Sequence, residues 1–262
     1  MGILNVTPDS FSDGGRFVDP VAAVDQAQKM IAEGADIIDI GGESTRPGVS
    51  YIDEKEEITR IRPIVEALGK RTDIPLSIDT RKAAVAQVAL DLGVAIVNDV
   101  SALQDDSGMA QVIAESGSGV VLMHRQGHSA TMQDAPHYED VVEEVKSFLA
   151  KRVALAQSMG IPPDHIIVDP GIGFGKTCNH NLKILANLGE ILALNQPLMV
   201  GISRKGFIGE LTGKLVAERE MGNAAAIAVA VWQGTHILRV HDVAAMKDSI
   251  RVAQALRNSC DK

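Results

Sequence analysis

The sequence contains few aromatic residues, few cysteines and little positive charge. Aromatic side chains make up 3% of its 262 residues, too few for the stacking platforms that bind single-stranded nucleic acid. The net charge of -9 also argues against a nucleic-acid partner, because nonspecific binding to nucleic acid needs a basic surface. The two cysteines, Cys178 and Cys260, match no metal-ligand spacing and favour a reducing compartment.

Long apolar runs and targeting signals are also missing. No apolar run approaches the ~18 residues at which a membrane span is suspected. Met1 leads directly into a strand-like run, so a signal peptide is not predicted. Myristoylation is not predicted either, because Val6 stands where that motif requires Ser or Thr. We therefore expect a soluble, cytoplasmic protein without a membrane partner.

What the sequence does contain is eight short apolar runs that alternate with helical periodicity. The runs are GILN, DIIDIGG, LSID, AIVND, VVLMH, IIVD, LMVGIS and ILRVH, and such runs are typical of strands buried on both faces. Helices are predicted over 19–32, 54–70, 82–92, 106–115, 140–159, 179–194, 218–233 and 243–257. No linker interrupts the alternation. The pattern therefore predicts an α/β fold, a single (β/α)₈ barrel over residues 1–262.

Each apolar run ends in a polar residue, and in such a barrel these ends meet at one mouth. Carboxylates such as Asp79 and Asp169 could there accept two N–H groups from the edge of a heterocycle. For Asp79 the alternative is a cap on the helix that follows it. Asn98 and Asp99 are adjacent, so only one of them can face the interior.

Two other polar strand ends are less informative. Asp39 precedes Gly41 by two residues, which places it inside the barrel just below the rim. It could belong to the site or serve as the structural partner of a neighbouring cation. His124 ends the fifth run, and we expect it to be a hydrogen-bonded structural residue.

The last strand carries two basic residues that suit an anion. Arg239 and His241 are two apart, so both point the same way, and the mouth after strands seven and eight is the usual phosphate site of barrels. This favours a phosphate or pyrophosphate ligand, with charge-assisted hydrogen bonds. The alternative is a surface ion pair with nearby acids.

Three loops are rich in glycine. DPGIGFGKT resembles a nucleotide-binding P-loop, but only three residues separate Gly171 from Gly175 where that motif has four, so ATP binding is rejected. A glycine loop with Phe174 at its apex can still wall an aromatic pocket. The loops over 6–17 and 41–48 are predicted to be lids that close over a ligand, the alternative being ordinary turns.

These segments together resemble a known family. NVTPDSFSDGG, GGESTRPG, IDT, ND, LMH, DPGIGFGK, GISRKGFIG and RVHD occur in one order along the chain, as in bacterial dihydropteroate synthases. The resemblance implies a TIM barrel that condenses 6-hydroxymethyl-7,8-dihydropterin diphosphate with p-aminobenzoate, giving 7,8-dihydropteroate and pyrophosphate. It also implies Mg²⁺, inhibition by sulfonamides and a homodimer. Most members begin with an additional β-hairpin, whereas this sequence opens on its first predicted strand.

The resemblance also assigns residues to substrates. It implies a pterin site of Asp79, Asn98, Asp169 and Lys205, and a diphosphate site of Asn5, Arg46, Arg239 and His241, with Mg²⁺ on Asn5. The p-aminobenzoate site would comprise Phe11, Thr45, Arg46, Pro47, Phe174, Lys205 and Gly206. At Gly206, where many members carry a hydroxyl or cationic residue, backbone N–H groups are predicted to hold the carboxylate. Catalysis would rest on Asp169, Lys205, Arg239 and His241.

The chemistry expected of such a site is substitution through a cation-like pterin. Positive charge on the exocyclic CH₂ develops as the C–O bond breaks, so stabilising the leaving pyrophosphate is the main catalytic task. Two alternatives stay open: a pterin methyltransferase of the methyltetrahydrofolate type, and a noncatalytic pterin-binding protein on the same scaffold.

Overall fold

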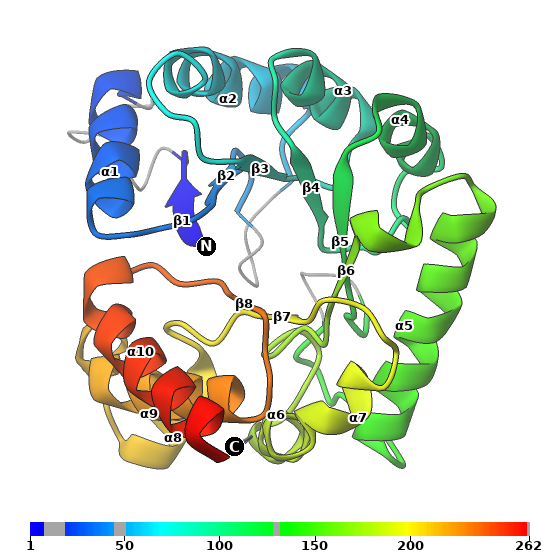
Figure 1. Ribbon diagram of the computed structural model, residues 1–262. Coiled ribbons are helices and arrows are strands. Elements are labelled where there is room, and N and C mark those ends of the chain that lie inside the picture. Colours follow the sequence, from blue (N-terminus) through cyan, green and yellow to red (C-terminus); the bar gives the residue numbers. More distant parts are fainter. Residues whose placement is uncertain (8–18, 45–50, 128–131, 261–262) are drawn as a thin grey trace.

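Eight parallel strands form a closed ring inside a layer of helices (Figure 1) in the computed structural model, which describes residues 1–7, 19–44, 51–127 and 132–260. β1 to β6 form one sheet in chain order and β7 pairs with β8. Single bridges, Val168 to Leu198 and Gly2 to Val240, join these two pieces. The predicted α/β barrel is therefore confirmed. Its strands are β1 (Gly2–Asn5), β2 (Ile38–Gly41), β3 (Leu76–Asp79), β4 (Ile96–Asp99), β5 (Gly119–Met123), β6 (Ile166–Asp169), β7 (Met199–Val200) and β8 (Ile237–Leu238).

The helices follow the strands in alternation and pack outside the ring (Figure 1). They begin where the sequence supplies a cap: Asp19 accepts the N–H of Val21 before α1, and Asp140 accepts that of Val142 before α5. Among the described residues, no helix has the length and apolar composition needed to cross a bilayer. The helices are α1 (Pro20–Ala32), α2 (Glu54–Leu68), α3 (Ala83–Asp91), α4 (Met109–Ser116), α5 (Val141–Ser158), α6 (Cys178–Ala186), α7 (Leu188–Leu192), α8 (Gly206–Thr212), α9 (Glu220–Trp232) and α10 (Val243–Cys260), with short 3₁₀ turns at Pro163–His165 and Val216–Glu218.

The helix predicted over 179–194 is in fact two helices, and α8 has no counterpart among the predicted elements. The break between α6 and α7 falls at Asn187, whose side chain donates to the carbonyl of Lys183. The N–H of Leu188 leaves the helical pattern and donates to Gln233 Oε1, at the end of α9. A partner 45 residues away thus interrupts the helix.

Side chains alternate between the inside of the ring and the helices. On β5, Val121 lies in an interior cluster with Met1 and Met199, whereas Val120 and Leu122 belong to the larger core against the helices. This alternation decides which residues of each strand can reach the mouth.

Polar residues occupy the inward positions nearest the mouth. Ile96 and Ile167 pack against the interior cluster, and Asn98 and Asp169 follow two residues later on the same strands. The lumen is therefore apolar below and polar at the mouth.

Core packing on α5 gives a first test. Leu149 is fully buried, whereas Leu155 on the same helix is 38% exposed. We expect Leu149→Ala to lower the free energy of unfolding by about 2–5 kcal/mol, because it removes buried methyl groups and leaves a cavity. Leu155→Ala should change it by less than about 1 kcal/mol. Urea denaturation measures both free energies of unfolding, and equal losses would contradict the placement of Leu149 on the buried face of α5.

Candidate active site

The ends of the first four strands lie at one level of the barrel. Asn5 pairs with Gly41, Gly41 with Asp79, and Asp79 with Asn98. Gly41 has no side chain, and a Cβ at this position would stand 3.7 Å from Asn5 Oδ1 and 3.8 Å from Asp79 Oδ2. An amide and a carboxylate therefore flank the position that a side chain at residue 41 would occupy.

Arg239, just after β8, reaches this row from the strand that closes the barrel beside β1. Its Nε donates to Asp39 Oδ2 at 2.6 Å and its Nη2 donates to Asp79 Oδ2 at 2.7 Å. Asn98 Nδ2 donates to the same Asp39 oxygen at 3.0 Å. Of the two roles considered for Asp39, the structure shows the partner of a cation. The ion-pair alternative for Arg239 is also met, although the pair lies inside the mouth and not on the surface.

Two further alternatives are decided by these contacts. Asp79 does not cap the next helix, because Asp106 Oδ2 accepts the N–H of Ala83 at the start of α3. Of the adjacent pair, only Asn98 reaches the interior. Asp99 instead accepts the N–H groups of Ser101 and Leu103 in the turn after β4.

The charges at this end of the mouth are unequal, since two buried acids share one guanidinium. Burial raises the pKa of Asp79 to about 7, against the lowering effect of Arg239. Burial alone would lower the pKa of Arg239, but Asp39 and Asp79 raise it. Arg239 therefore stays protonated, and Asp79 can donate or accept a proton near neutral pH. Asp39 Oδ1 is buried and has no hydrogen-bond partner in the described part of the chain.

Asp169, Lys205 and Phe174 form the other side of the mouth. Asp169 Oδ1 accepts the N–H of Gly171 at 2.7 Å, and burial raises the pKa of this carboxyl. Lys205 Nζ lies 4.0 Å from the centre of the Phe174 ring. Burial lowers the pKa of Lys205 to about 8. We call Phe174 and Lys205 the ring wall, because the Lys205 ammonium lies over the face of the Phe174 ring.

The structure places only some of the remaining predicted site residues. His241 Nδ1 lies 3.0 Å from Ser203 Oγ, so its contact differs from those of Arg239, with which it was expected to converge on an anion. Gly206 is exposed and opens α8. Phe11, Thr45, Arg46 and Pro47 lie outside the described residues, as does most of the two predicted lids.

Sequence reasoning missed Lys176, which the structure places beneath the ring wall. This buried residue ends the glycine loop, and its Nζ lies 2.8 Å from His124 Nδ1. His124 is thus hydrogen-bonded, as expected of a structural residue. The rejected P-loop match was the only sequence signal at Lys176, and it gave no indication of this partner.

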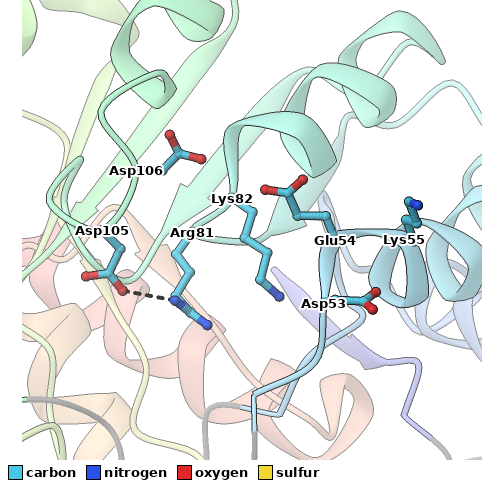
Figure 2. A pocket seen from close by; sticks show the side chains of 7 residues that line it. All are labelled: Asp53, Glu54, Lys55, Arg81, Lys82, Asp105 and Asp106. Atoms are coloured by element: carbon cyan, nitrogen blue, oxygen red, sulfur yellow. Dashed lines mark hydrogen bonds and ion pairs between the residues drawn. The ribbon is translucent and has the colours of Figure 1, made fainter.

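A second missed group of charges lies at the rim, between the starts of α2 and α3. It surrounds a pocket of about 460 Å³, in which Figure 2 shows Arg81 reaching Asp105. None of the predicted site residues lines this pocket. The lining residues are Asp53, Glu54, Lys55, Arg81, Lys82, Asp105 and Asp106.

Lys82 ties together residues on both sides of the segment 45–50. Its Nζ donates to Glu43 Oε1 at 3.0 Å, to Glu57 Oε2 at 2.6 Å and to the carbonyl of Ile52 at 2.8 Å. The N–H of Ile52 donates back to Glu43 Oε1 at 2.9 Å. One buried ammonium thereby fixes the chain on both sides of a segment that includes three predicted site residues.

This arrangement predicts a large effect of Lys82→Met. The substitution leaves the buried carboxylate of Glu57 without its cation and Glu43 with Arg81 alone, so the free energy of unfolding should fall by about 3–5 kcal/mol. Lys55→Met is the control, because Lys55 lines the same pocket but is exposed (Figure 2). Urea denaturation at pH 7 measures both. Similar small changes in the two variants would show that the Lys82 contacts do not stabilise the fold.

Comparison with known proteins gives one consistent result. The family described as pterin binding enzyme matches residues 1–241. Dihydropteroate synthase of Escherichia coli K12 is 45% identical over 255 residues, covering 97% of this chain and 90% of that protein. The structure of Yersinia pestis dihydropteroate synthase with a sulfonamide drug has a TM-score of 0.93 at 42% identity, covering 99% of this chain and 93% of the other. That of the Xanthomonas albilineans enzyme with 4-aminobenzoic acid has a TM-score of 0.92 at 46% identity, covering 98% and 92%.

Proposed function

The chain belongs to the pterin-binding enzyme family and, within it, to the dihydropteroate synthases, and we propose that its barrel mouth carries out that synthesis. The reaction joins 6-hydroxymethyl-7,8-dihydropterin diphosphate to p-aminobenzoate and releases pyrophosphate. The observation that carries the proposal is the set of polar side chains that face the barrel mouth, which we call the polar tier. The chain that bears it matches these synthases over nearly its whole length. The same likeness favours a synthase over the methyltransferase and the noncatalytic binder.

The pterin is held by the polar tier. Asp79, Asn98 and Asp169 offer carboxyl and amide groups at the ends of three strands, which suits a flat heterocycle with N–H and C=O groups on its edges. Because burial raises the pKa of Asp79 to about 7, that carboxyl can present either a donor or an acceptor. Lys205 supplies a further donor from the ring wall.

Bond exchange needs no strong base. The C–O bond to the diphosphate breaks and its electron pair leaves with pyrophosphate, while the lone pair of the aniline nitrogen forms the new C–N bond. That nitrogen then gives up one proton to the pyrophosphate. As positive charge develops on the pterin CH₂, the carboxyl of Asp169 stabilises it. Exclusion of water by the predicted lids would prevent hydrolysis of this cation-like species.

The diphosphate is held by Asn5, Arg46, Arg239 and His241. In the structure Arg239 gives two of its five N–H donors to Asp39 and Asp79, and a diphosphate that took the place of Asp79 would become its new partner. The exchange would free Asp79 Oδ2 for the pterin. Binding of the diphosphate and binding of the ring are thereby coupled through one guanidinium.

The donor set fits Mg²⁺. Asn5 Oδ1 is a neutral oxygen that, like Asp79 Oδ2, lies within 4 Å of the position of a Cβ on Gly41. No cluster of three or more His, Cys, Asp or Glu side chains suited to a metal occurs within the described residues. Mg²⁺ commonly takes one or two protein oxygens together with substrate phosphates and water. Asn5 would therefore hold an ion that arrives chiefly with the diphosphate. When bound, Mg²⁺ would supply positive charge to the leaving group.

The p-aminobenzoate ring lies against the ring wall, with Gly206 holding its carboxylate through backbone N–H groups and Phe11, Thr45, Arg46 and Pro47 completing the site. Sulfonamides would occupy the same place, a proposal supported by the sulfonamide complex of the Y. pestis relative. The enzyme acts as one domain, residues 1–262, in the cytoplasm. Two unpaired cysteines are consistent with that compartment.

A pyrophosphate-release assay tests the function. Release should require the pterin diphosphate, p-aminobenzoate and Mg²⁺ together, and a sulfonamide should inhibit it. Asp169→Asn should lower kcat/KM by about 100-fold, because the charge that stabilises the transition state is lost. Asp164→Asn, an exposed acid just before β6, is the control and should be unchanged. Pyrophosphate release that does not depend on p-aminobenzoate would rule out the proposed reaction.

A homodimer is proposed through the apolar outer face of α9 and α10. Met221, Val229 and Trp232 are spaced to lie on one side of α9 and are all about half exposed or more. Val252 and Leu256 are similarly exposed on α10, which packs beside α9 (Figure 1). Contiguous exposed apolar residues of this kind mark contact surfaces.

Trp232→Glu should therefore convert the dimer to a monomer in sedimentation experiments, since it places a charge within an apolar contact. Val21→Glu, at an exposed position on α1, is the matched control and should remain dimeric. A wild-type protein that is monomeric at micromolar concentration would exclude this dimer.

A further inference from the structure

Lys176 is a buried lysine to which the proposed reaction gives no role. It follows the glycine loop 171–175, and its side chain turns back beneath that loop. The Nζ atom lies 2.8 Å from His124 Nδ1, 3.0 Å from the carbonyl oxygen of Gly171 and 3.1 Å from that of Phe174. A fourth contact, to the carbonyl oxygen of His124, is longer at 3.4 Å.

The three short contacts match the three N–H donors of an ammonium group, the form that predominates below the pKa of Lys176, which burial lowers to about 7. Burial, together with the charge of Lys176, lowers the pKa of His124 to about 2, so its ring is neutral. The ring can then accept at Nδ1 while Nε2 carries the proton. The Phe148 ring packs on this imidazole in a T-shaped contact, with 4.8 Å between the ring centres. Each N–H donor of Lys176 thus has an acceptor, one at the end of β5 and two in the glycine loop.

The glycine loop lies tightly between the end of β5 and Lys205. A Cβ on Gly171 would stand 1.9 Å from the carbonyl oxygen of His124, and one on Gly173 would stand 2.9 Å from Lys205 Cδ. Both glycines have positive φ. The backbone therefore touches the end of β5 on one side and Lys205 on the other. Any shift of the loop away from β5 must change the ring wall.

We propose that Lys176 is a positioning residue for the ring wall. Its ammonium ties the carbonyls of Gly171 and Phe174 to His124 and so fixes the Phe174 ring against Lys205. The inference rests on the proposed function, in which this wall receives the aromatic ring of p-aminobenzoate. Asp79 and Asn98, which would hold the pterin, stand on strands that Lys176 does not contact.

The proposal predicts a selective kinetic change in Lys176→Met. This substitution keeps the length and apolar character of the chain but removes all three donors, leaving Phe174 free to shift. The KM for p-aminobenzoate should rise about tenfold, as expected when a group that orients a binding surface is lost. The KM for the pterin diphosphate should rise clearly less, because Asp79 and Asn98 keep their contacts and only Asp169, which accepts the N–H of Gly171, and Lys205 adjoin the loop. Lys183→Met, an exposed lysine on α6, is the control.

Substitutions of His124 test the same contact from the other side. Asn can place an amide oxygen near the position of Nδ1 and keep the acceptor, whereas Leu cannot. His124→Leu should therefore raise the KM for p-aminobenzoate as Lys176→Met does, and His124→Asn should restore most of the affinity. The double variant Lys176→Met/His124→Leu should be no worse than either single one, since both break one shared contact.

The outcomes separate the inference from the proposed function. Wild-type pyrophosphate release, measured first, tests the function alone. With an active wild type, an unchanged KM for p-aminobenzoate in Lys176→Met, or equal rises for both substrates, would overturn the positioning role. If Lys176→Met does not fold, the two His124 variants decide, and equal KM values for them would overturn it as well.

Discussion

A strand closed into a barrel can offer the interior only every second residue, and this constraint determines the site. Ile96 and Ile167 fill the lumen, so Asn98 and Asp169, two residues later, must face the mouth. Asp99, one position further on than Asn98, is buried outside the lumen and holds a turn instead. Shifting a strand by a single residue would exchange the residues that face the mouth with those that face the helices. The apolar pattern in the lumen therefore determines which polar side chains reach the mouth.

Charges gathered in this way must also be compensated within the barrel. Arg239 after β8 binds Asp39 on β2 and Asp79 on β3, and it does so across the seam where a single bridge, Gly2 to Val240, joins β8 to β1. The same guanidinium thus helps to close the ring and stands in the place proposed for the diphosphate. A ligand that draws Arg239 away acts on the seam as well as on the site, so substrate binding and barrel closure are linked by one side chain.

The sequence predicted those features that depend on local order along the chain. Apolar runs with polar ends predicted the strands and the tier of the mouth, and Asp19 before Pro20 predicted the start of α1. Contacts between distant residues carried no such signal: Gln233 breaks a helix 45 positions earlier, and Lys176 binds a histidine 52 positions earlier. The proximity of Phe174 to Lys205 was implied only by the family resemblance, because nothing in either segment specifies the other.

Lys82 and Lys176 each hold a loop segment in place through hydrogen bonds, but their partners differ. The difference matters near Asp169. Lys82 ties its segment with two carboxylates, Glu43 and Glu57, at the rim. Lys176 uses a neutral imidazole and two carbonyls. An acid in that place would put a second negative charge beside Asp169, whose pKa burial already raises, whereas the Lys176 ammonium works to lower it. Neutral partners therefore let one lysine fix the ring wall and still favour the charged carboxylate that the proposed reaction needs.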